Sequence, residues 1–195
     1  MNNKKNGLIR KICIISGIGL VTAAIVVLFA WQCTIHTAEK QTKEYVNAIR
    51  ESIPEPQDTV SEERSDNTMP TLSIDETDFV GILEMPRHES ALPVCTTWEN
   101  ISKYPCRFDG SIYDSTLQIG GTSQKGQYDF YRDISVGDPV IFTDMEGNSF
   151  SYEVTDLYYA KSADKTALKH KDSSLTLFIK NIYAFEYIIV YCNHK

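Results

Sequence analysis

The side chains with the widest chemical range in this sequence are five cysteines and four histidines. The cysteines stand at positions 13, 33, 95, 106 and 192, and none shares a C-x-x-C motif with another. This spacing argues against a zinc knuckle and against a thioredoxin-like redox site. One pair among Cys95, Cys106 and Cys192 could form a disulfide if this region is extracellular. Buried free thiols agree with the sequence at least as well, and the residues do not choose between these alternatives.

The histidines are scattered rather than clustered. His88 and His170 lie in segments predicted as loops, His194 lies at the C-terminus, and His36 follows a long apolar segment. None belongs to a group with metal-ligand spacing, so the sequence predicts no metal site and no cofactor. We expect the three downstream histidines to be solvated surface residues.

A series of short strands must position these side chains within residues 77–195. The hairpin loop at 144–148 contains Gly147, which can take a positive φ, and the strand after it alternates at Phe150, Tyr152 and Val154. Short apolar runs separated by turns predict an all-β closed barrel or sandwich, with one helical turn at 98–104 and a short helix or turn at 162–168. The predicted strands cover residues 79–86, 91–94, 117–120, 137–143, 150–154, 175–179 and 187–192.

The last two of these strands are the most strongly patterned. Residues 175–179 are apolar apart from Thr176, and residues 187–192 are β-branched and aromatic until Cys192. Cys192 lies an odd number of positions after Tyr187, so its thiol should face away from the Tyr187 side of the strand. The connection carries Tyr183, Phe185 and Glu186, whose aromatic members could line a surface groove or belong to the core.

The N-terminal region predicts a membrane anchor over residues 12–32, preceded by a basic tail at 1–11. Only Ser16 and Thr22 interrupt the apolar run from Ile12 to Trp31, which is long enough for a membrane-spanning helix. The four basic residues of the tail predict a cytoplasmic N-terminus and an extracellular C-terminal domain. A cleavable signal peptide fits less well because no small-x-small site follows, and bulky residues precede the lipoprotein-type candidate Cys33.

Residues 33–76 predict a polar, acidic stalk. Residues 38–49 are compatible with a short helix that places Tyr45, Val46 and Ile49 on one side. Residues 54–71 are rich in Pro, Glu, Asp, Ser and Thr, a composition typical of disorder. The downstream region contains no basic stripe, so the sequence argues against nucleic acid as a partner.

Several segments, taken in their order and spacing, resemble the sortases, the cysteine transpeptidases of Gram-positive cell surfaces. Val-Gly-Ile-Leu-Glu-Met-Pro at 80–86 is similar to the family's opening strand, and Leu-Pro-Val at 92–94 to the segment that follows it. Trp98 and the segment 105–111 resemble sortases related to class B and its neighbours. Leu-Thr-Leu-Phe at 175–178 resembles the strand that delivers the nucleophile, and the matches extend through 137–144 and 150–154. The resemblance implies the sortase-like eight-stranded β-barrel with short helices.

The family's three reactive positions are all substituted in this sequence. Sortases use a cysteine nucleophile, a histidine for proton transfer and an arginine for the oxyanion. The resemblance places these functions at Lys180, Thr122 and Tyr187, respectively. A threonine hydroxyl is not a base near neutral pH, a lysine amine is mostly protonated unless buried, and a tyrosine carries no positive charge. We therefore expect no catalytic residue at these positions, and a salt bridge between Lys180 and Glu186 where the reactive site would be.

The resulting hypothesis is a membrane-anchored, catalytically inactive pseudo-sortase that acts in binding or assembly of surface proteins. Its expected partners are the membrane, sorting-signal peptides, surface proteins or an intact sortase. One alternative is a transpeptidase, or an enzyme of altered mechanism, that uses Lys180 or a displaced cysteine. A structural domain without peptide affinity is the other.

Overall fold

The computed structural model describes residues 3–54, 67–161 and 173–195. The chain divides into two compact units, residues 1–37 and residues 38–195. The predicted short helix at 162–168, His170 and most of the predicted disordered segment at 54–71 lie outside the described residues.

Helix α1 (Asn3–Ser52) contains the apolar stretch predicted to cross a membrane. The helix reaches a mean hydropathy of 2.4 over its most apolar window, and no residue of that window is buried. Large side chains such as Leu20, Phe29 and Trp31 are exposed along it. About 20 apolar helical residues span a bilayer, so this stretch is long and apolar enough to do so.

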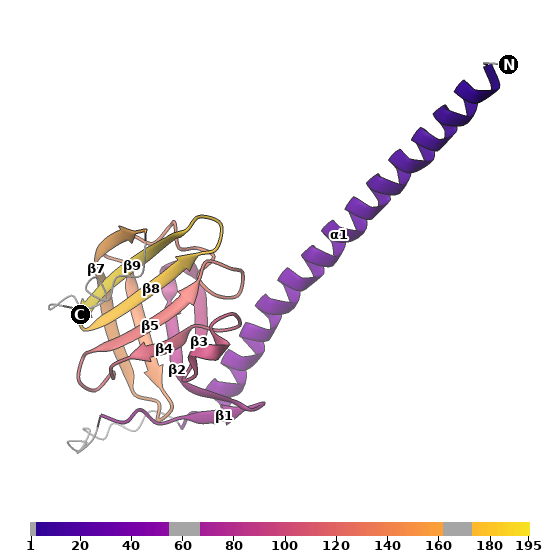
Figure 1. Cartoon of the computed structure of the whole chain (residues 1–195). Coiled ribbons are helices and arrows are strands. Elements are labelled where there is room, and N and C mark those ends of the chain that lie inside the picture. The colour runs from indigo at the N-terminus through magenta and orange to yellow at the C-terminus, as the bar shows by residue number, and fades with distance from the viewer. Residues whose placement is uncertain (1–2, 55–66, 162–172) are drawn as a thin grey trace. The chain divides into compact units, whose positions relative to one another are not determined.

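The second unit contains a closed eight-stranded β-barrel, as the sequence predicts (Figure 1). The strand order is β2-β3-β4-β5-β8-β9-β7-β6, and the ring closes because β2 pairs with both β3 and β6. The short strand β1 (Leu72–Ile74) adds to β2 outside this ring. The barrel strands are β2 (Thr77–Met85), β3 (Ser90–Cys95), β4 (Cys106–Asp109), β5 (Leu117–Thr122), β6 (Pro139–Asp144), β7 (Ser149–Ala160), β8 (Leu175–Asn181) and β9 (Glu186–His194). The described residues also form two short 3-10 helices, η1 (Pro86–His88) and η2 (Trp98–Asn100).

The barrel interior is filled by alternate residues of the strands. On β8, Leu175, Leu177 and Ile179 join the main core, and their β9 partners Cys192, Val190 and Ile188 join the same core. The intervening residues of both strands face the outside of the barrel, because successive side chains point to opposite faces of a sheet. This period of two is the pattern on which the strand predictions rested.

The predicted β6–β7 hairpin forms around a buried aspartate. Gly147 has a φ of 88°, as its place in the loop requires. The Asp144 carboxylate is fully buried and accepts hydrogen bonds from the backbone N–H groups of Glu146 and Asn148, each at 2.9 Å. These backbone N–H groups of the loop thereby have hydrogen-bond acceptors without pairing to a further strand.

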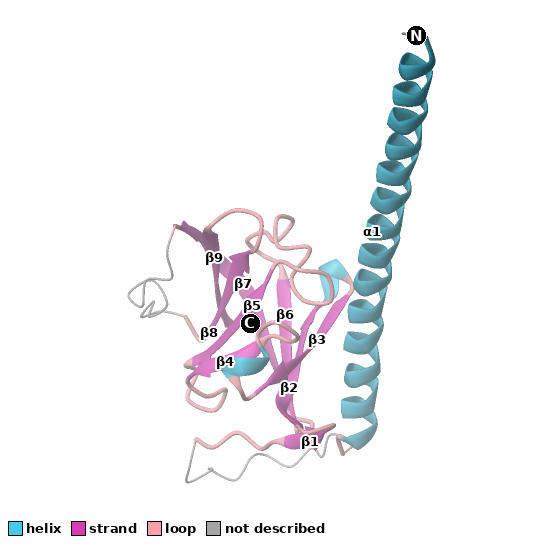
Figure 2. Cartoon of the chain, turned by 45° about the vertical axis from the view of Figure 1, so that its right-hand side comes forward, coloured by secondary structure: helices cyan, strands magenta, loops and turns pink. Residues whose placement is uncertain are grey.

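Part of the segment predicted as a stalk packs onto the barrel instead. Val46 and Ile49, near the C-terminal end of α1, are 3% and 0% exposed and join a second core cluster with Phe79 and Ile82 of β2. Figure 2 shows α1 and β1 next to the barrel strands at this end of the helix. A one-sided set of apolar residues on a helix needs a surface to cover it, and the barrel provides that surface.

Candidate functional site

The three positions at which the sequence resemblance places the reactive groups lie side by side on adjacent strands. Thr122, the last residue of β5, is the parallel partner of Lys180 on β8. Lys180 is in turn the antiparallel partner of Tyr187 on β9. Neighbouring strands lie about 4.8 Å apart, so the three side chains form one row across the sheet. Lys180 and Tyr187 share the outer face with Phe178, away from the barrel core.

An apolar cluster lies on the same outer face, next to this row. Phe178 is 5% exposed and packs with Ile189 and Tyr191 of β9. Its ring also contacts Trp98, stacked at 5.6 Å between centroids, and Phe108, edge-on at 5.2 Å.

Gly120 of β5 makes this aromatic contact possible. A Cβ at this position would lie 2.4 Å from Cζ of Phe178 and 2.6 Å from Cη2 of Trp98. Sequence reasoning did not identify Trp98, Phe108 and Phe178 as one cluster. The outward-facing position of Phe178, between the inward-facing Leu177 and Ile179, was the available signal.

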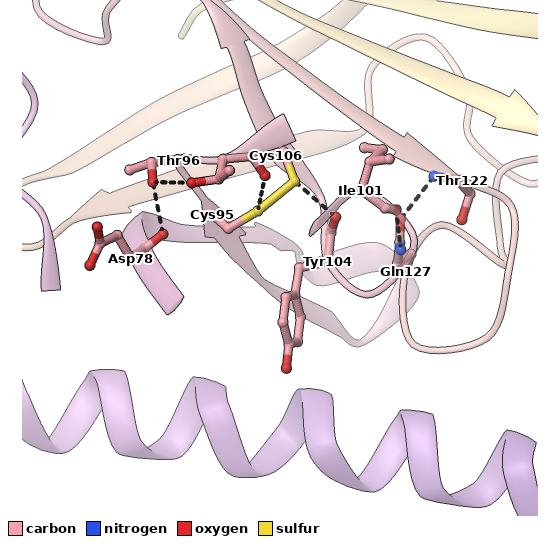
Figure 3. The surroundings of a disulfide bond; sticks show 9 residues. Asp78, Cys95, Thr96, Ile101, Tyr104, Cys106, Thr122 and Gln127 are labelled. Atoms are coloured by element: carbon pink, nitrogen blue, oxygen red, sulfur yellow. Dashed lines mark hydrogen bonds between the residues drawn. A yellow bond between two sulfur atoms is a disulfide. The ribbon is translucent and has the colours of Figure 1, made fainter. Parts of the chain in front are cut away.

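Thr122 is fixed by a glutamine from the loop that follows β5 (Figure 3). The Thr122 backbone N–H donates to Oε1 of Gln127 at 2.9 Å, and Nε2 of Gln127 donates to the carbonyl of Ile101 at 3.0 Å. Gln127 is 1% exposed, and it joins Thr122 to the loop that carries Trp98. The Thr122 hydroxyl is buried and has no hydrogen-bond partner among the described residues.

Lys180 does not form the salt bridge expected with Glu186. Glu186 is the cross-strand partner of Asn181, and its Oε1 accepts a hydrogen bond from Nδ2 of Asn181 at 2.9 Å. Asn181 and Lys180 are consecutive on β8 and therefore point to opposite faces. Among the described residues, the exposed Lys180 side chain makes no hydrogen bond or ion pair.

The aromatics between the last two strands lie in the connecting loop. Tyr183 is 76% exposed and Phe185 is 97% exposed, so neither belongs to the core. Tyr187 is half-buried beside Lys180. The loop is fixed at its base, because Oδ1 of Asn181 accepts from the Tyr183 N–H at 3.0 Å and Oγ of Ser123 accepts from the Ile182 N–H at 3.1 Å.

None of the four cysteines whose side chains the structure describes brings a thiol to this row. Cys95 and Cys106 form a disulfide, which settles the pairing that the sequence left open. Cys192 is a free thiol in the barrel core, facing away from the side of Tyr187 as predicted. Burial raises the pKa of the Cys192 thiol, which disfavours the nucleophilic thiolate. Cys33, the other free cysteine among residues with described side chains, lies on α1 outside the barrel unit.

His88 differs from the sequence expectation of a solvated surface histidine. Its side chain is 8% exposed, its Nε2 lies 3.0 Å from Oδ2 of Asp138, and its ring stacks on Phe130 at 4.8 Å. Nη1 of Arg87 donates to Oδ1 of the same aspartate at 2.6 Å. The contacts of Arg87 and His88 with Asp138 join η1 to the start of β6. This cluster is therefore separate from the row on β5, β8 and β9.

The environment of Asp138 keeps it ionised. Burial by itself would raise the pKa of this carboxyl. The backbone N–H of Ser135 and the side chains of His88 and Arg87 overcome that effect, and the pKa is lowered. Separately, the described residues contain no group of three or more His, Cys, Asp or Glu side chains placed to hold a metal ion.

Comparison with known proteins gives a consistent structural result despite low sequence identity. No protein-family model matches the sequence. A search of curated proteins also finds no match.

Solved structures do resemble the chain. The sortase D5 transpeptidase of Clostridium perfringens is 13% identical, with a TM-score of 0.56 over 82% of this chain and 99% of that one. Sortase C1 of Streptococcus agalactiae is 21% identical, with a TM-score of 0.54 over 85% and 89%. C. perfringens sortase C, in a structure with the C-terminal cell wall sorting motif, is 16% identical, with a TM-score of 0.54 over 80% and 98%. The chain therefore has a sortase-like fold.

Proposed function

We propose that this chain is a membrane-anchored pseudo-sortase at the cell surface, which binds sorting-signal peptides or the proteins that carry them and does not join them. The observation that carries the proposal is the row of Thr122, Lys180 and Tyr187 on three adjacent strands. These are the positions at which the sequence resemblance places the reactive groups. The row contains a hydroxyl, an amine and a phenol, and no thiol, imidazole or guanidinium.

The chemistry of the row supports binding rather than turnover. Lys180 is exposed, and an amide formed by its amine would resist the second half of a transpeptidation. Thr122 offers no base, and Tyr187 offers one neutral donor to an oxyanion. Removing a single oxyanion donor costs on the order of 10²–10³ in rate, and here nucleophile and base are replaced as well.

The face beside the row supports peptide binding. Trp98 and Phe108 are 42% and 43% exposed and stand over the nearly buried Phe178. Aromatic side chains that are half open to solvent offer apolar contact to an extended peptide. The similar sortase C structure contains a C-terminal cell wall sorting motif, which makes this peptide class the first to test.

The N-terminal helix supports anchoring. Its apolar stretch satisfies the length requirement for a bilayer, and the basic residues Lys4, Lys5, Arg10 and Lys11 precede it. The proposed orientation places the N-terminus in the cytoplasm and the barrel outside. An intact sortase or its surface-protein substrates would then be available as partners in the same compartment.

Binding and mass spectrometry on the full chain in detergent micelles test the proposal. A fluorescent sorting-signal peptide should bind saturably, with neither cleavage nor a covalent adduct, and a scrambled peptide should not bind. Trp98→Ala should weaken binding, whereas Val136→Ala, at a 61% exposed site on another loop, should not. Cleavage, or an adduct on Lys180, would instead establish an enzyme of altered mechanism, and absence of binding would indicate a structural domain.

A further inference from the structure

The loop between β8 and β9 exposes four consecutive apolar residues, Ile182 to Phe185. Ile182, Tyr183 and Phe185 are 46%, 76% and 97% exposed. Single exposed apolar residues are ordinary on protein surfaces, but a continuous exposed run is not expected unless it has a function. Phe185 in particular contributes almost nothing to the folding of the barrel.

The loop is a shaped turn rather than a frayed segment. The Asn181 side chain is 2% exposed and bonds both to the Tyr183 backbone N–H at 3.0 Å and to Glu186 at 2.9 Å. Ser123, 4% exposed, holds the Ile182 N–H from the end of β5. Buried polar groups therefore hold the backbone in a form that keeps the apolar side chains outside.

Strand β7 adds two more exposed aromatics at the same end of the barrel. Its last residues run beside the first residues of β9, with Tyr158 opposite Ile189 and Tyr159 opposite Ile188. Tyr158 and Tyr159 are 51% and 59% exposed. We call the loop residues Ile182, Tyr183 and Phe185 the aromatic tip. Tyr158 and Tyr159 flank it, and as consecutive strand residues they point to opposite faces of β7.

Among the described residues, the charged side chains near the aromatic tip are of mixed sign, and exposed lysines lie next to the ends of β7 and β8. Lys180 precedes the β8–β9 loop, and Lys161 follows the end of β7, both exposed. Glu186 is half-buried and bonded to Asn181, and Asp156 lies farther back on β7, opposite Tyr191. Lysine and tyrosine beside aliphatic and phenyl groups are typical of the interfacial region of a bilayer.

The size of the aromatic tip favours a lipid surface over a protein surface. The large aromatic side chains of its loop offer about 150–250 Å² each. Tyr183 and Phe185 together fall below the roughly 800 Å² per partner of a stable protein interface. A bilayer needs no complementary shape, so each side chain of a small protruding loop can enter it independently.

We propose that the aromatic tip inserts into the headgroup region of a lipid bilayer. The inference rests on the proposed membrane anchorage, because α1 would keep the barrel at a high effective concentration near the surface. Under that condition, the modest affinity of one loop is sufficient to orient the domain. The proposed partner is a lipid surface that contains anionic headgroups, which the two exposed lysines would attract.

Fluorescence quenching by lipid tests this proposal on the full chain. Trp31→Phe removes the tryptophan of the apolar helix, and Phe185→Trp places a reporter on the aromatic tip. The protein is reconstituted in phosphatidylcholine–phosphatidylglycerol vesicles with and without doxyl-labelled lipid. We expect quenching above the Trp98 background for the reporter at 185 and none for a matched reporter, Val136→Trp. Adding Tyr183→Ser should weaken insertion about tenfold, the change expected for burial of one large side chain.

The possible outcomes distinguish failure of the proposed membrane anchorage from failure of the proposed insertion of the aromatic tip. Failure of the chain to float with the vesicles would overturn the anchorage itself. Flotation with equal quenching at 185 and 136 would overturn the inference alone. Self-association in detergent that Phe185→Ser abolishes would overturn it in favour of a second copy of the chain as the occupant. Reduced insertion in vesicles without phosphatidylglycerol would support the contribution of the lysines.

Discussion

Lys180 of β8 and Tyr187 of β9 are direct cross-strand partners on the outer face of the barrel. Their register is continuous with the pairs below it, down to Leu175 and Cys192. A shift by one residue would move every side chain of the strand to the other face, so the buried pairs fix where this outer pair lies.

A thiol placed at this position should be accessible, unlike the native thiol of the core. We expect a disulfide-forming thiol reagent to label Lys180→Cys in the folded chain, because residue 180 is exposed. Cys192 should react only after unfolding, because it is fully buried and its pKa is raised. Mass spectrometry after native and denaturing labelling measures both sites, with Cys33→Ser as the common background. Native labelling at Cys192 would contradict the placement of that thiol.

Introducing a histidine, a cysteine and an arginine into the row should create a peptide adduct. The triple variant Thr122→His, Lys180→Cys and Tyr187→Arg places imidazole, thiol and guanidinium on one row of the sheet. We expect the thiolate at 180 to attack a backbone carbonyl of a sorting-signal peptide and break its C–N bond. The N-terminal part then stays on the protein as a thioester, and the C-terminal part leaves as an amine that takes its proton from the imidazole. Mass spectrometry detects the thioester, and hydroxylamine removes it. The single variant Lys180→Cys should form at least about 10²-fold less thioester adduct, because it lacks the imidazole base and the guanidinium that donates to the oxyanion. Equal adduct in both variants would show that the row does not reproduce the reactive geometry.

The close packing over Gly120 predicts a loss of stability on substitution. Gly120→Ala would place its Cβ within 2.6 Å of both Phe178 and Trp98, so we expect a loss of about 1–3 kcal/mol in the free energy of unfolding. Urea denaturation measures this change, with Gln118→Ala on the same face of β5 as the control. The double variant Gly120→Ala, Phe178→Ala should lose less than the sum of the two single losses. If the losses of the two single variants simply add in the double variant, the contact between residues 120 and 178 does not contribute to stability.

The disulfide should stabilise the loop that carries Trp98. Cys95 and Cys106 are separated by 11 positions, and closing a loop of this size contributes about 3 kcal/mol. Reductant should therefore lower the free energy of unfolding of the wild-type chain and leave the variant Cys95→Ala, Cys106→Ala unchanged. Urea denaturation monitored by Trp98 fluorescence measures both. An equal response in the two proteins would assign the effect of the reductant to another site.

Asp138 predicts a loss of stability in acid. Its pKa is lowered in the folded state, so its contribution is complete above the ordinary aspartate pKa of about 3.9. The contribution is lost as the pH falls from there through the lower folded-state value. Asp138→Asn should therefore destabilise the protein at neutral pH, and the difference from wild type should shrink below about pH 4. Denaturation at several pH values checks this, with exposed Asp133→Asn as the control. A difference that does not change with pH would contradict the assignment.

The strands of this fold could be predicted because their signals are local. The alternation of Phe150, Tyr152 and Val154 and the period of β8 follow directly from which face is buried. The family resemblance then predicted the closed barrel. The register brings Thr122, Lys180 and Tyr187 into one row, and their correspondence to reactive positions stays a prediction.

The features that sequence reasoning missed depend on contacts between distant segments. Val46 and Ile49 were identified as one side of a helix, but the sequence did not show that the barrel would cover them. His88 looked like a loop residue because its partner Asp138 lies far along the chain. The expected contact of Lys180 with Glu186 was wrong because proximity in sequence does not specify the face of the sheet. Asn181 takes Glu186 instead.

The parallel pairing of β5 with β8 has a consequence for how this surface arises during synthesis. Residues 123–179, which include the β6–β7 hairpin, separate Thr122 from Lys180 in the chain. The two residues therefore become neighbours only after this whole segment has been synthesised and β8 has paired with β5. A nascent chain that ends before β8 cannot form the row of Thr122, Lys180 and Tyr187. A ligand that requires this row can therefore bind only after β8 and β9 have emerged from the ribosome.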